Sequence, residues 1–92
     1  FSPAEYRKAT AKTAKAALEK VEAAAQAAGV ACEGRSVTGE LAWEAIIRTA
    51  RSRKCDLIVM ASHGRRGLSG LLIGSETAKV LTHSKVPVLV VR

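Results

Sequence analysis

Two uninterrupted apolar runs in the C-terminal half constrain the fold of this chain more than any other feature. They span residues 57–60 and 86–91, and neither shows the alternation that is typical of a strand with one exposed face. Such runs are expected for strands of a parallel sheet that helices cover on both faces. A helical pattern over residues 75–84 lies between them, which predicts a β-α-β unit. Pro87 should lie at the start of its strand or on an unpaired side, because proline cannot donate a sheet hydrogen bond.

A long helix is predicted upstream. Residues 2–28 are rich in Ala, Lys and Glu. Ser2 suits the N-cap position, Pro3 suits the first turn, and Gly29 is expected to end the helix. The lysines along it are interpreted as a solvated face.

The middle of the chain adds a weak strand and a second helix. Residues 30–37 are a short strand candidate that Gly34 interrupts. A helix should follow over about residues 40–54, with Trp43 in the apolar stripe that faces the core. The order of elements predicts the α/β class, with an open parallel sheet and flanking helices.

Composition indicates a globular protein rather than a disordered or membrane-spanning one. Of the 92 residues, 48% are hydrophobic and 25% are charged, which excludes a disordered tail. The longest apolar run is far below the ~20 residues that a membrane span needs, and no signal peptide is evident. Cys32 and Cys55 lack metal-ligand spacing and are expected to be reduced and half-buried. We therefore expect a cytoplasmic protein with no membrane partner.

The positive charge is unevenly distributed. The net charge is +7, and residues 57–92 carry five basic groups against one acidic group. Arg65 and Arg66 are adjacent there in a glycine-rich loop, with no aromatic residues interleaved for base stacking. This pattern favours a local anion site, and a nucleic-acid partner is disfavoured.

The glycine-rich segment carries the chemistry of the chain. It begins where a buried strand ends and stops where a helix starts, which is where ligands bind in open parallel sheets. Glycines let the backbone approach an anion, and the first N–H groups of a helix point outward without partners. Together these features predict a phosphate cradle between Ala61 and Ser75. Ser75 is expected to cap the helix and offer its hydroxyl to a phosphate, whose charge Arg65 or Arg66 can neutralise.

The residues of the segment are also compatible with, or argue against, several other interpretations. The chain contains neither GxGxxG nor GxxxxGK[ST], which argues against a Rossmann fingerprint and a P-loop. Four glycines in a loop are also compatible with a turn-rich connection that binds nothing. Ser62 and His63 are adjacent and have no orienting carboxylate nearby, so no catalytic residue is predicted. His63 is instead expected to donate a hydrogen bond to ligand or backbone.

The segment resembles the nucleotide-binding members of the universal stress protein family. These carry Gly-x-x-Gly, nine residues, and then Gly-Ser or Gly-Thr after the fourth strand. Gly64, the nine residues that follow, and Gly74-Ser75 match this spacing, whereas Ala61 replaces the first glycine. Alanine is small enough to let the backbone lie close to a phosphate if its φ is negative, but it would be strained at a positive φ. The resemblance extends over the whole chain.

The resemblance implies a fold and a set of site residues. The fold would be the adenine nucleotide alpha hydrolase-like arrangement of five parallel strands and four helices. Residues 1–92 would be the C-terminal part of one such domain, with the last three strands and three helices. The N-terminal β-α-β portion, which holds the family's adenine-contacting aspartate, would then lie upstream. The positions implied around the phosphates and ribose of the nucleotide are Ala61, His63, Gly64, Arg65, Gly74, Ser75 and Glu76.

The implied function is a nucleotide-dependent stress-response module that binds ATP or AMP, with at most weak ATP hydrolysis. Glu76 would repel a phosphate unless a divalent ion intervened, so a role for magnesium is left open. Family members commonly form homodimers through their last strands, which implies an interface at Val88, Leu89, Val90 and Val91. The alternative is a dimeric interaction module of the same fold that does not bind nucleotide, and Ala61 is its main support.

Overall fold

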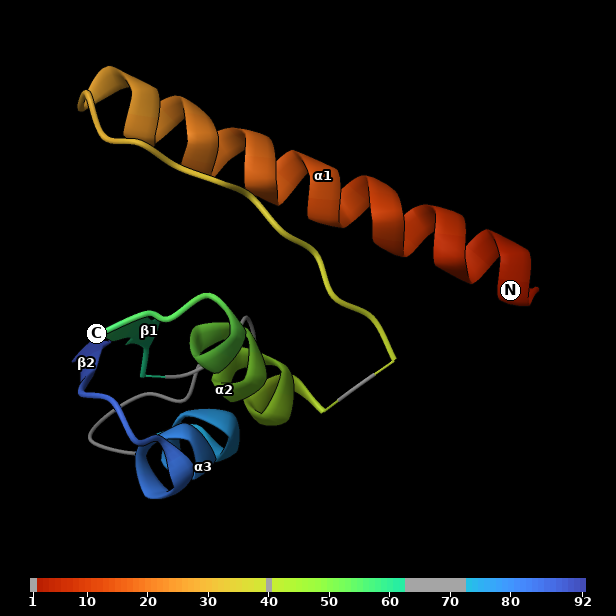
Figure 1. The fold of residues 1–92 in the computed structure, drawn as a ribbon. Helices are drawn as coiled ribbons and strands as arrows, with labels where there is room; N and C mark the ends of the chain where they lie inside the picture. The colour runs from red at the N-terminus through yellow and green to blue at the C-terminus, as the bar shows by residue number, and fades with distance from the viewer. Residues whose placement is uncertain (1, 40, 63–72) are drawn as a thin grey trace. The chain divides into compact units, whose positions relative to one another are not determined.

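The computed structural model describes residues 2–39, 41–62 and 73–92. The elements along the chain are α1 (Pro3–Ala27), α2 (Ala42–Ser52), β1 (Ile58–Ala61), α3 (Ser75–His83) and β2 (Val88–Val91) (Figure 1). The chain divides into two units, Phe1–Thr38 and Gly39–Arg92. The combination of a parallel sheet with flanking helices confirms the predicted α/β class.

In the first unit, local signals define the ends of α1. The Ser2 hydroxyl accepts from the Glu5 N–H at 3.1 Å, and the Glu5 carboxylate accepts from the Ser2 N–H at 3.2 Å. This reciprocal capping box satisfies two backbone donors, and Pro3 starts the helix with a suitable φ. Gly29 follows the end of the helix with a φ of +70°, and its N–H donates to the Gln26 carbonyl. The predicted start and stop of this helix are confirmed.

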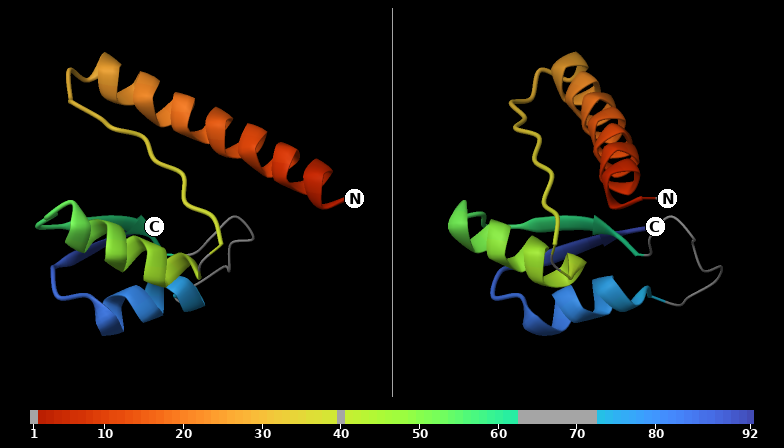
Figure 2. Two further views of the ribbon diagram at one scale, coloured as in Figure 1. Left: turned by 45° about the vertical axis from the view of Figure 1, so that its right-hand side comes forward. Right: turned by 90° about the vertical axis from the view of Figure 1, so that its right-hand side faces the viewer.

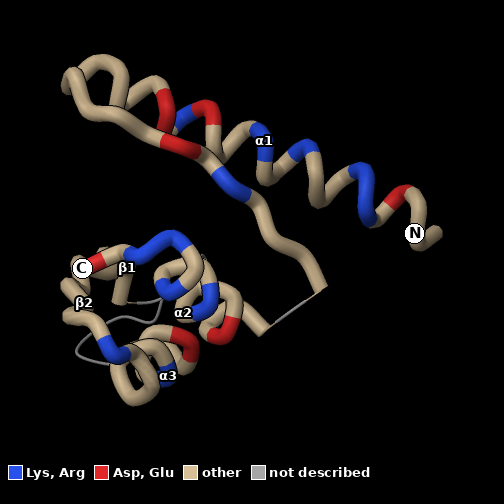
Figure 3. The backbone as a smooth tube through the Cα atoms, viewed as in Figure 1, with Lys and Arg blue, Asp and Glu red and all other residues tan. Residues whose placement is uncertain are grey.

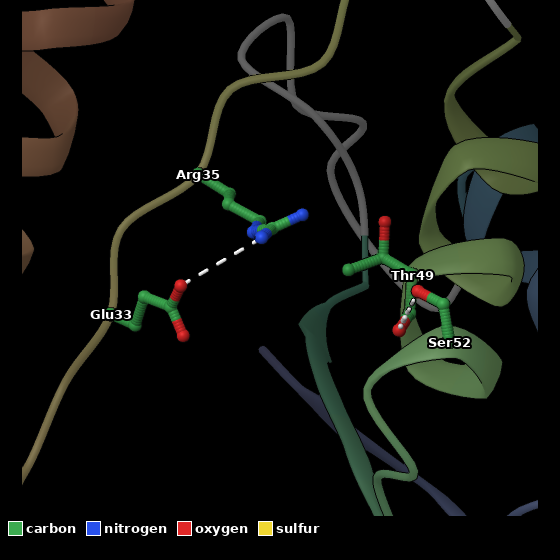
Figure 4. A network of polar contacts seen from close by, with 4 residues as sticks. All are labelled: Glu33, Arg35, Thr49 and Ser52. Atoms are coloured by element: carbon green, nitrogen blue, oxygen red, sulfur yellow. Dashed lines mark hydrogen bonds and ion pairs between the residues drawn. The ribbon is translucent and has the colours of Figure 1, made fainter.

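The strand predicted at residues 30–37 is wrong, because no strand forms there within the described chain. A strand needs a hydrogen-bonded neighbour, and the described sheet contains β1 and β2 alone. The chain at Gly34 instead lies against α1. A Cβ at Gly34 would lie 3.2 Å from Leu18 Cδ2, so glycine permits this approach. An exposed ion pair joins Arg35 to Glu33 at 3.8 Å (Figure 4).

The second unit contains the sheet. Strands β1 and β2 are parallel, with Ile58 opposite Val88 and Ala61 opposite Val91. Pro87 lies immediately before β2, as predicted. The two strands and α3 therefore form the expected β-α-β unit.

Both helices of this unit share one face of the sheet with a small core (Figure 2). Val80 of α3 is 0% exposed and packs with Ala50 of α2 and Ile58 of β1. Partly buried side chains surround these three: Trp43, Ile46, Ile47, Met60, Val86 and Val88. The prediction that Trp43 faces the core is confirmed.

Within the second unit, helices pack on one face of the two strands. Side-chain burial alternates along β1 and β2, and Val59, Leu89 and Val91 are exposed. The cause is that α2 and α3 pack on the same face, which Ile58 and Val88 line.

The second helix is shorter than expected. Helix α2 covers 11 residues rather than about residues 40–54. Its last residue, Ser52, donates its hydroxyl to the Thr49 carbonyl at 3.2 Å (Figure 4). Lys54 then adopts a φ of 55°, which helical backbone does not allow. The chain therefore turns toward β1 at this point.

Candidate functional site

Two hydrogen bonds hold together the end of β1 and the start of α3, on either side of the predicted loop. The Gly74 N–H donates to the Ser62 carbonyl at 2.7 Å. The Thr77 hydroxyl donates to the Ala61 carbonyl at 2.8 Å. Ser62 and Thr77 are both buried, so water does not compete strongly for these bonds. The base of the loop is thus fixed to the sheet.

The N-terminus of α3 lies beside this base. Gly74 is its N-cap residue, with φ −61° and ψ 152°, and no side chain of the described residues caps the helix. The expectation that Ser75 is the cap is wrong, because Ser75 already belongs to the helix as its first residue. Glycine has no side chain that could accept a hydrogen bond. The first amides of α3 consequently form a positive helix end that can receive an anion.

Ala61 fits its position without backbone strain. It is the last residue of β1 and is exposed. Among the described residues, Lys54 is the one non-glycine residue with a positive φ, so Ala61 has a negative φ. A Cβ is tolerated in that conformation. The replacement of the motif's first glycine by alanine therefore distorts nothing in the local backbone.

Glu76 links the N-termini of two helices. Its Oε2 accepts a 2.9 Å hydrogen bond from the Trp43 N–H, in the first turn of α2. The N-cap residue of α2 is Leu41, whose side chain cannot accept such a bond. A carboxylate at this point also favours the dipoles of both helices. Glu76 thereby compensates for the missing local cap of α2.

The predicted site residues are described only in part. Ala61 lies at the end of β1, while Gly74, Ser75 and Glu76 lie at the start of α3. The remaining predicted positions are His63, Gly64 and Arg65, which lie outside the described residues.

Thr77 and Ser62 were missed by the sequence reasoning. Both contribute to the base of the loop through hydrogen bonds to or from the backbone. A signal for Thr77 was present, since a hydroxyl residue three positions before the buried Val80 lies on the inner side of α3. Such a residue needs a hydrogen-bond partner in the core.

Neither a metal-binding cluster nor a membrane-spanning helix is found among the described residues. No group of three or more His, Cys, Asp or Glu side chains among residues 2–39, 41–62 and 73–92 is arranged to hold a metal ion. Within the same residues, none of the helices has both the length and the apolarity required to cross a bilayer. Cys32 and Cys55 are free and exposed, so the expectation that they are half-buried is wrong.

One protein family matches the whole sequence. The model of the universal stress protein family matches residues 1–92. A universal stress protein of Methanocaldococcus jannaschii is 40% identical over 76 residues, which are 83% of this chain and 44% of the relative. One of Thermus aquaticus is 40% identical over 75 residues, which are 80% of this chain and 55% of the relative.

A third relative, from a Synechocystis strain, is 39% identical over 80 residues, or 87% of this chain and 25% of the relative. The chain thus spans about half the length of the first two relatives and a quarter of the third. With a family match over every residue and relatives at about 40% identity, this chain belongs to the universal stress protein family.

Proposed function

We propose that this chain supplies the phosphate-binding part of an ATP or AMP site, and that the protein is a nucleotide-dependent stress-response module of the cytoplasm. The observation that carries the proposal is the N-terminus of α3 at Gly74 and Ser75, which no side chain of residues 2–39, 41–62 or 73–92 caps and which follows the Gly64-to-Gly74 spacing. Amides that lack a side-chain acceptor are suited to phosphate oxygens.

The fixed base of the loop supports this role. Because the Gly74–Ser62 and Thr77–Ala61 bonds already hold α3 against β1, a phosphate would not have to order these elements on binding. Ser75 is exposed, so its hydroxyl is accessible to a ligand. An anion at such a helix end gains roughly 0.3–2 kcal/mol from the helix dipole, depending on burial.

The remaining predicted residues have distinct roles in the proposal. Arg65 supplies a positive charge for the phosphates, while His63 donates a hydrogen bond and Gly64 allows close backbone approach. The charge of Glu76 is partly offset by the Trp43 N–H that it accepts, which reduces its repulsion of a phosphate. A magnesium ion between Glu76 and the phosphates would remove that repulsion. The site binds nucleotide, with at most slow hydrolysis.

The second candidate is a dimeric interaction module that does not bind nucleotide. Its support is Ala61, which replaces the first glycine of the motif. It shares with the first candidate the outer edge of β2, which pairs with no other strand in the described sheet. An unpaired edge is a template for a second copy of the same strand. In both candidates the homodimer forms through Val88, Leu89, Val90 and Val91.

Calorimetric titration of the intact protein with ATP tests the proposal. The double substitution Gly74→Val and Ser75→Ala should weaken binding at least about tenfold, which corresponds to ~1.4 kcal/mol. Thr82→Ala is the matched control, because it removes an exposed hydroxyl near the opposite end of α3. Unchanged affinity in the double variant would overturn the assignment. Mass spectrometry of small molecules released from the purified protein distinguishes the two candidates, since only the first retains a nucleotide.

A further inference from the structure

An open depression lies between α2 and the C-terminal end of α3, within the second unit. It has a volume of about 460 Å³. Its lining combines aromatic, aliphatic and charged side chains: Trp43, Glu44, Ile47, Arg48, Arg51 and His83. We propose that this depression binds an acidic segment of a partner protein, independently of nucleotide.

The floor of the depression is aromatic and firmly held. The Trp43 indole stacks on the His83 imidazole, with ring centroids 4.7 Å apart and an interplanar angle of 25°. Trp43 and Ile47 also pack against the core, so the floor is preorganised. The indole Nε1 is buried and has no hydrogen-bond partner among the described residues. A buried donor without a partner costs free energy, so an acceptor that a bound segment supplied to it would stabilise the complex.

The rim of the depression is positively charged. Arg48 and Arg51 lie three residues apart on α2 and are therefore neighbours on its surface. The planar guanidinium group of arginine can bind a carboxylate with two parallel hydrogen bonds. Glu44 is the one acidic residue in the lining. Arg48 already has an interaction within the chain, so Arg51 is the arginine on which the proposal relies.

The net charge of the second unit also favours an acidic partner. Residues 41–62 and 73–92 carry seven lysines and arginines against three aspartates and glutamates, a net charge of +4. Figure 3 shows basic residues along α2. One of the three acidic residues, Glu76, already accepts the Trp43 N–H. A partner with acidic side chains is complementary to this surface.

A protein segment fits the depression better than a nucleic acid does. Single-stranded nucleic acids need exposed aromatic faces for base stacking, and His83 already stacks on Trp43. Tryptophan and arginine are, by contrast, the residues that most often dominate protein–protein binding energy.

Tryptophan fluorescence provides a direct test. Trp43 is the one tryptophan of this sequence, and a Trp43→Phe variant assigns any emission change to it. The probe is a short acetylated peptide of alternating Glu and Leu, titrated into the intact protein. The controls are the matching Gln and Leu peptide and a short oligothymidylate. We expect saturable binding of the acidic peptide alone, which weakens as the salt concentration rises.

Charge reversal on the rim completes the experiment. Arg51→Glu and Arg51→Gln should each raise the dissociation constant of the acidic peptide at least about tenfold, whereas Arg51→Lys should raise it less. Arg92→Glu makes the same charge change outside the depression and should leave binding within about twofold. Equal binding by wild type and Arg51→Glu would overturn the proposal. So would a response to the Gln and Leu peptide or to oligothymidylate that matches the response to the acidic peptide.

Discussion

The Thr77 hydroxyl donates a 2.8 Å hydrogen bond to the main-chain carbonyl oxygen of Ala61. Thr77 lies in the first turn of α3, and Ala61 is the last residue of β1. Thr77 is only 3% exposed, so the bond is shielded from solvent. The bond fixes the start of α3 against the sheet and thereby sets the position of the first amides of the helix.

Replacement of Thr77 by valine should destabilise the protein. Valine keeps the shape of threonine but removes the donor, which leaves the Ala61 carbonyl without this partner. We expect the free energy of unfolding in urea to fall by about 1–3 kcal/mol. The control is Thr82→Val, because the Thr82 hydroxyl bonds to the Ala78 carbonyl at an exposed position. Equal stability of the two variants would contradict the structural role of Thr77.

Substitution of Ser75 by aspartate separates folding from nucleotide binding. Ser75 is the first residue of α3, where a carboxylate stabilises a helix by about 0.3–1 kcal/mol through its dipole. The same charge should repel a phosphate and weaken ATP binding at least about tenfold. Thermal unfolding and ATP titration measure the two effects. A stable Ser75→Asp protein that binds ATP like wild type would remove the helix end from the proposed site.

The success of the sequence-based predictions depended on how local each signal was. The start of α1 was predictable because Ser2 and Pro3 act within one turn. The strand at residues 30–37 was not, since a strand depends on a neighbour that local sequence does not identify. The link from Glu76 to Trp43 spans 33 positions, and the N-cap at Leu41, which calls for a distant acceptor, is known only from the structure.

In the candidate site, too, short-range patterns were readable in the sequence, whereas the backbone conformation was not. The spacing from Gly64 to Gly74-Ser75 was readable in the sequence, and so was the positive charge nearby. The cap was misplaced by one residue, because Gly74 and Ser75 both suit a helix start and only the backbone dihedral angles distinguish them.

Removal of the Glu76 carboxylate should loosen the start of α2. Glu76→Ala leaves the part-buried Trp43 N–H without its acceptor, and we expect a loss of about 1–3 kcal/mol in the free energy of unfolding. Glu76→Gln keeps an acceptor oxygen and should lose less. Trp43 emission reports the change, since its backbone is the donor. Identical stability of the alanine and glutamine variants would exclude a capping role.

Glu76→Gln also tests how the carboxylate affects a phosphate. In EDTA, the variant should bind ATP more tightly than wild type, because it removes a negative charge beside the helix end where the phosphates are proposed to bind. With magnesium, the order should reverse if the carboxylate contributes to holding the ion. ATP titrations under both conditions measure the two dissociation constants. No difference in either condition would remove Glu76 from the predicted site residues.

The backbone of β2 has one side that faces β1 and one that faces outward. The Pro87 carbonyl accepts from the Ile58 N–H at 2.9 Å, and the Val91 carbonyl accepts from the Ser62 N–H at 2.8 Å. Because backbone groups alternate along a parallel strand, Leu89 also faces β1, whereas Val88 and Val90 direct their N–H and carbonyl groups to the outer edge.

This alternation gives a sharp test of the proposed homodimer. Val90→Pro removes an N–H from the outer edge, which a folded sheet tolerates, so the variant should fold but form the dimer poorly. Leu89→Pro removes an N–H that faces β1, so the variant should lose its sheet and much of its stability. Light scattering after size-exclusion chromatography measures the assembly state, and circular dichroism measures folding. A folded Val90→Pro protein that remains fully dimeric would place the interface elsewhere than the edge of β2, because strand pairing at that edge requires the donor that proline lacks.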